Sequence, residues 1–163
     1  MCRFSMMLIC LCAATASAAQ ACPEGYQTLV SCTLEGGKKR VQTCMAGDRV
    51  TYEFGRRGQP PELSLNRSIT EVDMYPWSGV SRSIWEDIGF ENAGIWYRVF
   101  YSQERDPRST EVSGGIRVEQ GETLLAELFC DAGSVETAGY PLPVFDAKTA
   151  AGQQFNHLTY TWE

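Results

Sequence analysis

The sequence predicts an all-β fold, an antiparallel β sandwich or small barrel of about eight or nine short strands, stapled by disulfides. Three observations lead to this expectation. Short segments with alternating apolar and polar residues recur about every 8 to 12 residues, and clusters of glycine, proline and charged residues separate them. No window of about eleven or more residues shows the 3.6-residue apolar period of a helix. Four cysteines lie beyond the first 21 residues, which is enough for two cross-links.

Residues 1–21 have the pattern of a secretory signal peptide. Arg3 supplies the positive charge, residues 6–14 form a short apolar run, and small residues continue up to Ala21. The apolar run is about half of the ~20 residues that a membrane-spanning helix needs, so we expect no membrane span. We therefore expect an exported protein, located in a bacterial periplasm or outside the cell.

Residues 22–133 form the predicted β domain, and residues 134–163 form an irregular C-terminal segment. The expected strands are, in chain order, 29–34, 40–45, 50–54, 63–65, 69–74, 83–90, 95–101, 116–119 and 123–130. Segment 123–130 is apolar almost throughout, which predicts a central strand that is covered on both faces. The C-terminal segment has no clear period, although the alternating residues 158–162 predict an edge strand.

The hairpin formed by segments 83–90 and 95–101 carries large side chains on both faces, so its register decides which of them are buried. We expect Phe90 to lie opposite Ile95 across a four-residue turn. This register creates one apolar core face, which Glu86 alone interrupts.

The other face of the same hairpin carries Trp85, Trp96 and Phe100, with Asp87 opposite Arg98. Aromatic and opposite-charge pairs of this kind stabilise neighbouring strands by roughly 0.2 to 1 kcal/mol each. We expect this second face to be half-exposed, or covered by a loop or by the C-terminal tail.

The cysteines Cys22, Cys32, Cys44 and Cys130 predict two disulfides, since the predicted compartment is oxidising. Three connectivities remain open. At least one bridge ties the first strands to the last, unless Cys130 stays unpaired. No close C-x₂-C pair occurs among these four, so the sequence predicts no zinc site, no other metal and no cofactor.

The charge balance bears on the class of partner. The whole chain has 14 basic and 20 acidic residues, and leaving out Arg3 gives 13 − 20 = −7 for the exported part. No basic cluster exceeds residues 38–40, so we expect no nucleic-acid partner. An acidic surface favours a cationic protein or an envelope component as partner. The sequence does not decide the oligomeric state.

Catalytic motifs are sparse. His157 is the single histidine, and no G-x-S-x-G elbow occurs. Glu86 and Glu127 each interrupt an apolar strand, so a small carboxylate-dependent hydrolase centred on one of them is an alternative prediction. The plainer interpretation is that each glutamate pairs with an arginine, for which Arg82, Arg98 and Arg117 are candidates, or lies at a sheet edge. A structural envelope protein without a discrete ligand is a third interpretation.

The leading prediction is a non-enzymatic binding or inhibitory module. Its predicted binding residues are Trp77, Trp85, Trp96, Arg98 and Phe100. Trp77 lies on a glycine-containing loop, where a tryptophan either anchors a partner or folds back over the end of the sheets.

A small, acidic, disulfide-linked exported β domain broadly resembles the periplasmic lysozyme inhibitors of bacteria, whose C-type group carries an S-G-x-x-Y loop. The comparable stretch here, residues 78–82 (SGVSR), has Arg82 in place of the tyrosine. Because the diagnostic residue is missing, the resemblance implies a kind of function and does not assign the chain to that family.

Overall fold

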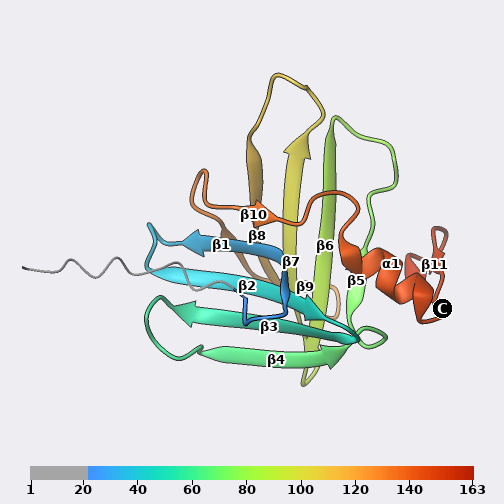
Figure 1. Ribbon diagram of the computed structural model, residues 1–163, viewed down its shortest axis with the longest axis horizontal. Helices are drawn as coiled ribbons and strands as arrows, with labels where there is room; N and C mark the ends of the chain where they lie inside the picture. The colour runs from blue at the N-terminus through green and yellow to red at the C-terminus, as the bar shows by residue number, and fades with distance from the viewer. Residues whose placement is uncertain (1–21) are drawn as a thin grey trace, which may run out of the picture.

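The computed structural model describes residues 22–163 and shows an antiparallel β sandwich (Figure 1). The described residues form two five-stranded sheets, here called sheet A and sheet B, and a small two-stranded hairpin. The sequence pattern did not predict strand β10, Glu136–Thr137, because two residues are too few to show alternation. The predicted signal peptide, residues 1–21, lies outside the described residues.

Sheet A has the strand order β10-β1-β2-β3-β4, with antiparallel neighbours throughout. Its longer strands are β1 Gln27–Leu34, β2 Lys39–Ala46, β3 Arg49–Arg56 and β4 Leu63–Ser68. The turn between β1 and β2 takes positive φ at Gly36 and Gly37, a conformation that glycine adopts without steric cost. Asp131 accepts hydrogen bonds from both backbone N–H groups, so a residue about 95 positions later in the chain holds the turn.

Sheet B has the order β5-β6-β7-β8-β9, again antiparallel throughout. Its strands are β5 Asp73–Tyr75, β6 Ser83–Asn92, β7 Ile95–Glu104, β8 Val112–Gln120 and β9 Thr123–Phe129. Each sheet is therefore largely a meander of consecutive hairpins.

The register predicted for the β6–β7 hairpin is wrong by two residues. Phe90 lies opposite Tyr97, and Asn92 lies opposite Ile95. The turn has two residues, Ala93 and Gly94, both with positive φ, and such turns match the twist of the flanking strands better than the four-residue turn that we expected. Because side chains alternate with a period of two, a two-residue shift leaves every side chain on its predicted face.

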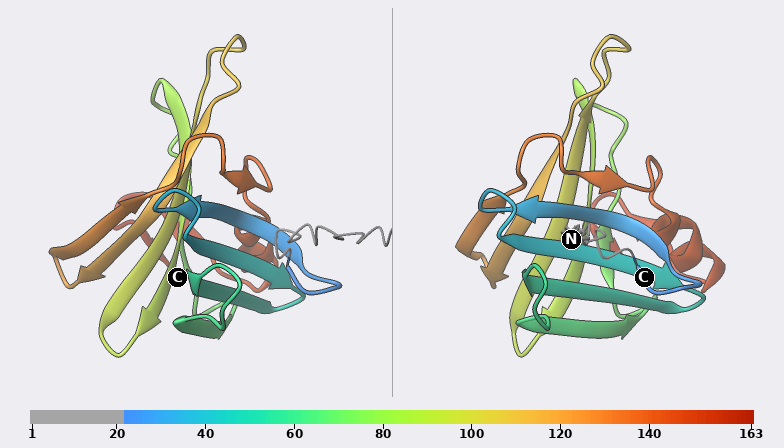
Figure 2. Two further views of the ribbon diagram at one scale, coloured as in Figure 1. Left: turned by 90° about the vertical axis from the view of Figure 1, so that its left-hand side faces the viewer. Right: turned by 60° about the vertical axis from the view of Figure 1, so that its left-hand side comes forward.

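The strands of the two sheets cross one another (Figures 1 and 2). Crosswise packing buries the middle of each sheet and leaves the corners open. The core lies between the sheets, and its largest fully buried apolar side chains are Leu29, Leu34, Tyr52, Met74, Ile88, Phe90, Tyr101, Ile116 and Leu142.

The structure resolves the disulfide connectivity as Cys22–Cys44 and Cys32–Cys130. The first bridge fastens the start of the described chain to β2. The second joins β1 of sheet A to the residue after β9 of sheet B, across a sequence separation of 98. In the chain-entropy model a loop of this length stabilises the fold by about 4 to 5 kcal/mol. Two disulfides are compatible with an oxidising compartment.

The C-terminal segment contains more regular structure than its sequence predicts. Helix α1, Pro143–Ala150, was not expected, because eight residues barely complete two turns and carry little periodicity. The small hairpin consists of β11, Phe155–Asn156, and β12, Thr161–Trp162. The expected strand at 158–162 is thus reduced to β12, which pairs with β11. No helix in residues 22–163 is long and apolar enough to cross a membrane.

The prediction that segment 123–130 is a central strand is wrong. Strand β9 forms one edge of sheet B, and all of its residues except Leu128 are exposed. The β8–β9 hairpin extends past sheet A, which therefore covers little of it (Figure 2). An apolar run indicates burial only if another element reaches the strand, and in this fold sheet A crosses sheet B elsewhere.

Candidate functional site: the outer face of sheet B

Four of the five predicted binding residues lie on one surface, the face of sheet B that points away from sheet A. We call this surface the outer face. Trp85 comes from β6, whereas Trp96, Arg98 and Phe100 come from alternate positions of β7. Strand alternation places them together, because the intervening residues of both strands point into the core. The fifth residue, Trp77, lies on the connection between β5 and β6.

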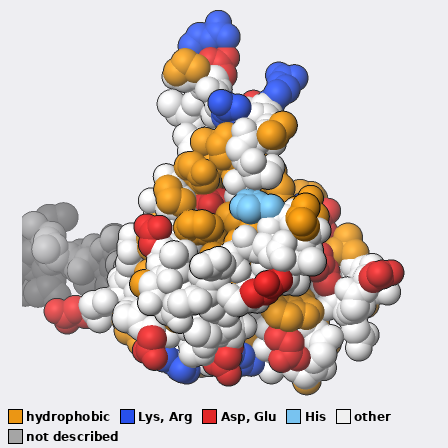
Figure 3. All heavy atoms as spheres, turned by 90° about the vertical axis from the view of Figure 1, so that its right-hand side faces the viewer, with side chains coloured by type: hydrophobic (Ala, Val, Ile, Leu, Met, Phe, Trp, Pro, Cys, Tyr) orange, Lys and Arg blue, Asp and Glu red, His pale blue; other side chains and the backbone are white. Residues whose placement is uncertain are grey.

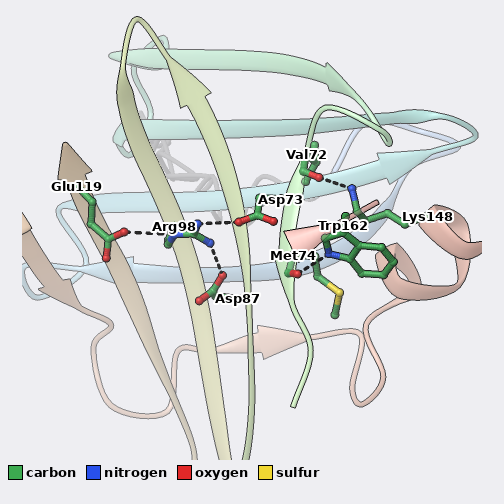
Figure 4. A network of polar contacts seen from close by, with 8 residues as sticks. All are labelled: Val72, Asp73, Met74, Asp87, Arg98, Glu119, Lys148 and Trp162. Carbon is green, nitrogen blue, oxygen red and sulfur yellow. Dashed lines mark hydrogen bonds and ion pairs between the residues drawn. The ribbon is translucent and has the colours of Figure 1, made fainter. Parts of the chain in front are cut away.

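Arg98 lies among three carboxylates on the outer face (Figure 4). Its Nη2 is 2.7 Å from Oδ2 of Asp73, and its Nη1 is 3.0 Å from Oδ1 of Asp87. Its Nε is 3.2 Å from Oε2 of Glu119. We call these four residues the Arg98 cluster, and because they come from β5, β6, β7 and β8 the cluster links four adjacent strands.

The sequence analysis predicted that Asp87 pairs with Arg98, but it placed Asp87 directly opposite Arg98 on the neighbouring strand. In the structure Gly89 is opposite Arg98, and Asp87 reaches the guanidinium diagonally. The absence of a side chain at Gly89 makes room for the guanidinium, since a Cβ there would lie 3.1 Å from Nη1 of Arg98.

Burial and charge act against each other in this cluster. Burial raises the pKa of the Asp87 carboxyl to about 6, against the lowering effect of Arg98. Burial alone would lower the pKa of the Arg98 guanidinium, but the carboxylates of Asp87 and Asp73 outweigh it and raise that pKa. Arg98 is therefore charged at any physiological pH, whereas the raised pKa of Asp87 lets that carboxyl take up a proton near pH 6.

The C-terminal segment covers the β5 side of the outer face. The ring of Tyr75 stacks on Trp85 at 5.8 Å and on Tyr160 at 5.3 Å between centroids. The indole N–H of Trp162 donates to the backbone carbonyl of Met74 at 2.7 Å (Figure 4). The expectation that a tail covers this face is thus confirmed for its β5 side.

Lys148 of α1 is a residue that the sequence reasoning missed. It is 1% exposed, and its Nζ donates to the backbone carbonyls of Ile69 and Val72. Figure 4 shows the contact with Val72. Its ammonium also lies 4.9 Å from the centre of the Trp162 ring. Burial lowers the pKa of Lys148 to about 8. A lone lysine in an alanine- and threonine-rich segment carries no signal of burial, so only the fold could show it.

A groove of about 430 Å³ lies between the Arg98 cluster and the C-terminal hairpin. Trp96 and Arg98 form one side of it, and Lys148, Tyr160 and Trp162 form the other. The charged side chains that line the groove already contact other groups of the chain. The groove therefore marks where the C-terminal hairpin packs against sheet B.

The other half of the outer face, toward β9, is left uncovered by the C-terminal segment. A hollow of about 310 Å³ is lined there by Trp85, Phe100 and Arg117, together with Tyr101 and Ser102. The Arg117 guanidinium lies 4.4 Å from the centre of the Phe100 ring. We call this region the Trp85–Phe100 hollow.

Gly115 makes the Trp85–Phe100 hollow sterically feasible. A Cβ at Gly115 would lie 2.8 Å from Cζ of Phe100, so a side chain there would displace the ring. Beside Phe100, at 6.3 Å between ring centroids, lies Phe129 of β9, which is 65% exposed.

Trp77 is half-buried near the end of the sandwich, on one of two loops that project beyond it (Figure 1). Its ring packs edge-on against Tyr140 at 5.4 Å and lies 5.1 Å from the Arg105 guanidinium. Trp77 therefore caps the end of the sheets at the base of the projecting loops and lies apart from the four residues of the outer face. Basic side chains occupy the tips of the loops, with hydrophobic ones below them (Figure 3).

The two glutamates of the hydrolase alternative lie in different environments. Glu86 is fully buried on the inner face of β6, where its Oε2 accepts hydrogen bonds from the Tyr101 hydroxyl and the Leu142 N–H, both at 2.9 Å. Burial raises the pKa of Glu86, and its Oε1 has no hydrogen-bond partner among residues 22–163. The expected pairing of Glu86 with an arginine is therefore wrong.

Glu127 lies on the outer face of β9 and pairs with Arg117 at 2.9 Å, as the plainer interpretation expected. Three strand spacings of ~4.8 Å separate β6 from β9, and the two glutamates point to opposite faces of sheet B. They do not form one acid–base pair.

Residues 22–163 contain no group of three or more histidine, cysteine or acidic side chains arranged to hold a metal ion. Comparisons with protein-family models, curated proteins and solved structures found no significant match.

Proposed function

We propose that the chain is an exported, non-enzymatic binding module that holds a partner protein at the Trp85–Phe100 hollow. The observation that carries this proposal is the uncovered aromatic surface beside β9, because the C-terminal segment covers the aromatic side chains on the β5 side of the same face. Half-buried aromatic rings beside an arginine are the composition of binding hot spots. The disulfides support export, and a bacterial periplasm is the compartment that we propose.

The charge of the chain supports a cationic partner. Residues 22–163 carry 13 basic and 20 acidic residues, a net charge of −7. A long-range field of this sign steers positively charged proteins toward the surface and raises their association rate. The hollow itself is close to neutral, because Glu127 pairs with Arg117. Apolar contact in the hollow and long-range attraction around it would therefore act together.

The test compares two matched truncations in the disulfide-bonded chain of residues 22–163. Phe100→Ser removes a ring from the hollow, whereas Leu158→Ser removes a side chain that is 91% exposed and does not line the hollow. Each variant is immobilised and exposed to an envelope extract of the source cells, and the retained proteins are identified. Circular dichroism and thermal unfolding confirm that both variants fold.

We expect the wild type and Leu158→Ser to retain the same basic protein, and Phe100→Ser to lose at least about tenfold in affinity for it. The attraction should also weaken when the salt concentration rises from about 0.05 M to about 0.5 M. Equal retention by a folded Phe100→Ser variant would refute the hollow as the binding surface.

No observation in the structure favours the alternative functions, a carboxylate-dependent hydrolase or a structural envelope protein. Glu86 is sealed in the core, and Glu127 has an ordinary surface ion pair. A structural envelope role stays a prediction that the capture experiment would favour if no partner were retained.

A further inference from the structure

Basic side chains gather at one end of sheet A, in a chain that is acidic as a whole. Lys38, Lys39 and Arg40 lie at the end of the β1–β2 turn and the start of β2, whereas Arg56 and Arg57 lie where β3 ends. The antiparallel pairing of β2 with β3 brings the two segments side by side (Figure 1). Five of the 13 basic residues in the exported part of the chain therefore meet at one corner of the fold.

The register of β2 and β3 places like charges opposite one another. Lys39 lies directly opposite Arg56. One position further, the backbone N–H of Arg57 donates to the carbonyl of Lys38 at 3.0 Å, so these two residues also face each other. Like charges directly opposite each other destabilise a strand pair. Two such pairs in succession oppose folding, and a bound anion would remove their repulsion.

Carboxylates of the chain neutralise only part of this positive charge. Lys39 pairs with Glu35 at 3.3 Å. Arg56 reaches Glu62 only at 4.0 Å, and 76% of the Arg56 side chain is exposed. The remaining three cations form no ion pair with any of residues 22–163, and they are Lys38, Arg40 and Arg57.

Two of these unpaired cations lie close enough to repel each other. Burial lowers the pKa of the Arg40 guanidinium, and the carboxylates of Glu136 and Glu53 oppose this effect. The positive charge of Arg57 lowers the same pKa further. Like charges act on a pKa in this way only at close range. Arg40 therefore adds to the positive potential around Arg57.

A hollow of about 700 Å³ lies where the two basic segments meet, and we call it the basic hollow. The side chains that line it are mostly hydrogen-bond donors, and its lining residues are Glu35, Gly37, Lys38, Lys39, Arg56, Arg57 and Gln59. The one carboxylate of this set, Glu35, is already paired with Lys39. Arg57 donates to the carbonyl of Gly37 at 3.4 Å, which places its guanidinium beside the turn. Hollows of about 300–1,000 Å³ are large enough for small ligands.

We propose that the basic hollow binds the phosphate group of a phosphate ester, either a soluble one or a lipid headgroup. The forked donors of Arg56 and Arg57 match the oxygens of a phosphate group, and the two lysines add compact charges. A phosphate group carries ~1.5 to 2 negative charges at pH 7, so it offsets more of the repulsion between the opposed cations than a carboxylate does. The basic hollow lies on sheet A, whereas the Trp85–Phe100 hollow lies on sheet B, so this ligand is independent of the proposed protein partner.

Pyrophosphate is the probe for the phosphate site. Its affinity for the disulfide-bonded chain of residues 22–163 is measured by calorimetric titration, and thermal unfolding is compared in pyrophosphate and in NaCl of equal ionic strength. A ligand that binds only the folded chain stabilises it. We expect the midpoint of unfolding to rise by about 3 °C or more when pyrophosphate is about tenfold above its Kd.

Arg57→Gln tests the site, and Arg82→Gln is its matched control. Both variants remove one exposed positive charge, but Arg82 lies on the β5–β6 connection and does not line the basic hollow. Arg57→Gln should bind pyrophosphate at least about tenfold more weakly, and Arg82→Gln should bind it like the wild type. In NaCl alone, Arg57→Gln should unfold at the wild-type temperature or higher, because it removes a repulsion.

Vesicles distinguish the two sources of the phosphate group. They consist of phosphatidylcholine alone or with about 30 mol% phosphatidic acid. Sedimentation of the wild type, and not of Arg57→Gln, with the acidic vesicles would assign the site to a lipid headgroup. Binding of pyrophosphate without sedimentation would assign it to a soluble phosphate ester.

Four results would overturn the proposal. The first is a wild type that does not bind pyrophosphate at about 10 mM. The second is an equal loss of affinity in Arg57→Gln and Arg82→Gln, and the third is equally tight binding of polyglutamate, since both would indicate a general attraction between charges. The fourth is a lower unfolding midpoint of Arg57→Gln in NaCl, which would show that Arg57 supports the fold. None of these results bears on capture of a protein at the Trp85–Phe100 hollow.

Discussion

Replacing Arg98 with methionine tests whether the Arg98 cluster holds sheet B together. Methionine preserves much of the aliphatic stem and removes the guanidinium. Asp87, whose side chain is 7% exposed, then loses its cationic partner, and the loss of such a charge-assisted hydrogen bond costs about 2 kcal/mol. Asp73 and Glu119 are 23% and 28% exposed, so each of their pairs adds only about 0.5 kcal/mol. We expect a loss of about 3 kcal/mol in the free energy of unfolding.

Arg117→Met is the matched control, because Arg117 lies directly opposite Arg98 on the neighbouring strand and on the same face. It pairs with one carboxylate, Glu127, and both partners are at least 30% exposed. Its loss should cost less than about 1 kcal/mol. Both arginines also lie over an aromatic ring, so the comparison isolates the buried ion pairs.

The assay is urea unfolding of the oxidised proteins, with thermal unfolding as a second readout. A loss of about 3 kcal/mol corresponds to a midpoint of thermal unfolding about 10 °C lower for a chain of this size.

The loss of stability in Arg98→Met should also depend on pH. The pKa of Asp87 is about 6 in the wild type and rises further without Arg98, whereas it is 3.8 in the unfolded chain. A carboxyl whose pKa is raised by folding loses stability as the pH rises through that pKa. The difference between the variant and the wild type should therefore grow above pH 6.

Equal losses in Arg98→Met and Arg117→Met would refute this reasoning, since they would show that the cluster contributes no more than a surface ion pair. A loss that does not change between about pH 5 and about pH 8 would refute the role of Asp87 in particular.

Two further predictions concern buried ionisable groups. Folding lowers the pKa of Lys148 from its ordinary value to about 8, so above pH 8 the unfolded chain binds more protons than the folded chain. The free energy of unfolding of the wild type should therefore rise above pH 8, by up to about 1.4 kcal/mol per pH unit. Urea unfolding at about pH 8 and about pH 9.5 should show this rise in the wild type and not in Lys148→Met; a rise in both would assign it to other groups. Burial raises the pKa of Glu86, so its contribution to stability is lost as the pH rises through that raised value. Glu86→Gln, which removes the charge and keeps the shape, should therefore unfold at higher urea than the wild type near pH 8 and lose this advantage near pH 4. A destabilisation of Glu86→Gln near pH 8 would refute this reasoning, since it would show that the Tyr101 hydroxyl and the Leu142 N–H need a charged acceptor there.

Local sequence pattern predicts much of sheet B because strand alternation is a local property. It placed Trp85, Trp96, Arg98 and Phe100 on one face, and the two-residue error in register did not change that face. The pattern of cysteines predicted two disulfides in the same way, although not which cysteines pair. The length of the turn between β6 and β7 could not be predicted in this way, because residues 91–94 allow either a two-residue or a four-residue turn. The twist of the paired strands selects between the two.

The sequence by itself determined the class of fold, the alternation of buried and exposed positions along each strand, and the number of cross-links. The tertiary structure decided that the apolar strand β9 is an exposed edge, that Lys148 is buried, and that the C-terminal segment covers one half of the outer face. The physical reason is that alternation reports what a strand can bury, whereas burial depends on which distant segment lies against it. In this sandwich sheet A crosses sheet B away from β9, and nothing local in residues 123–129 encodes that crossing.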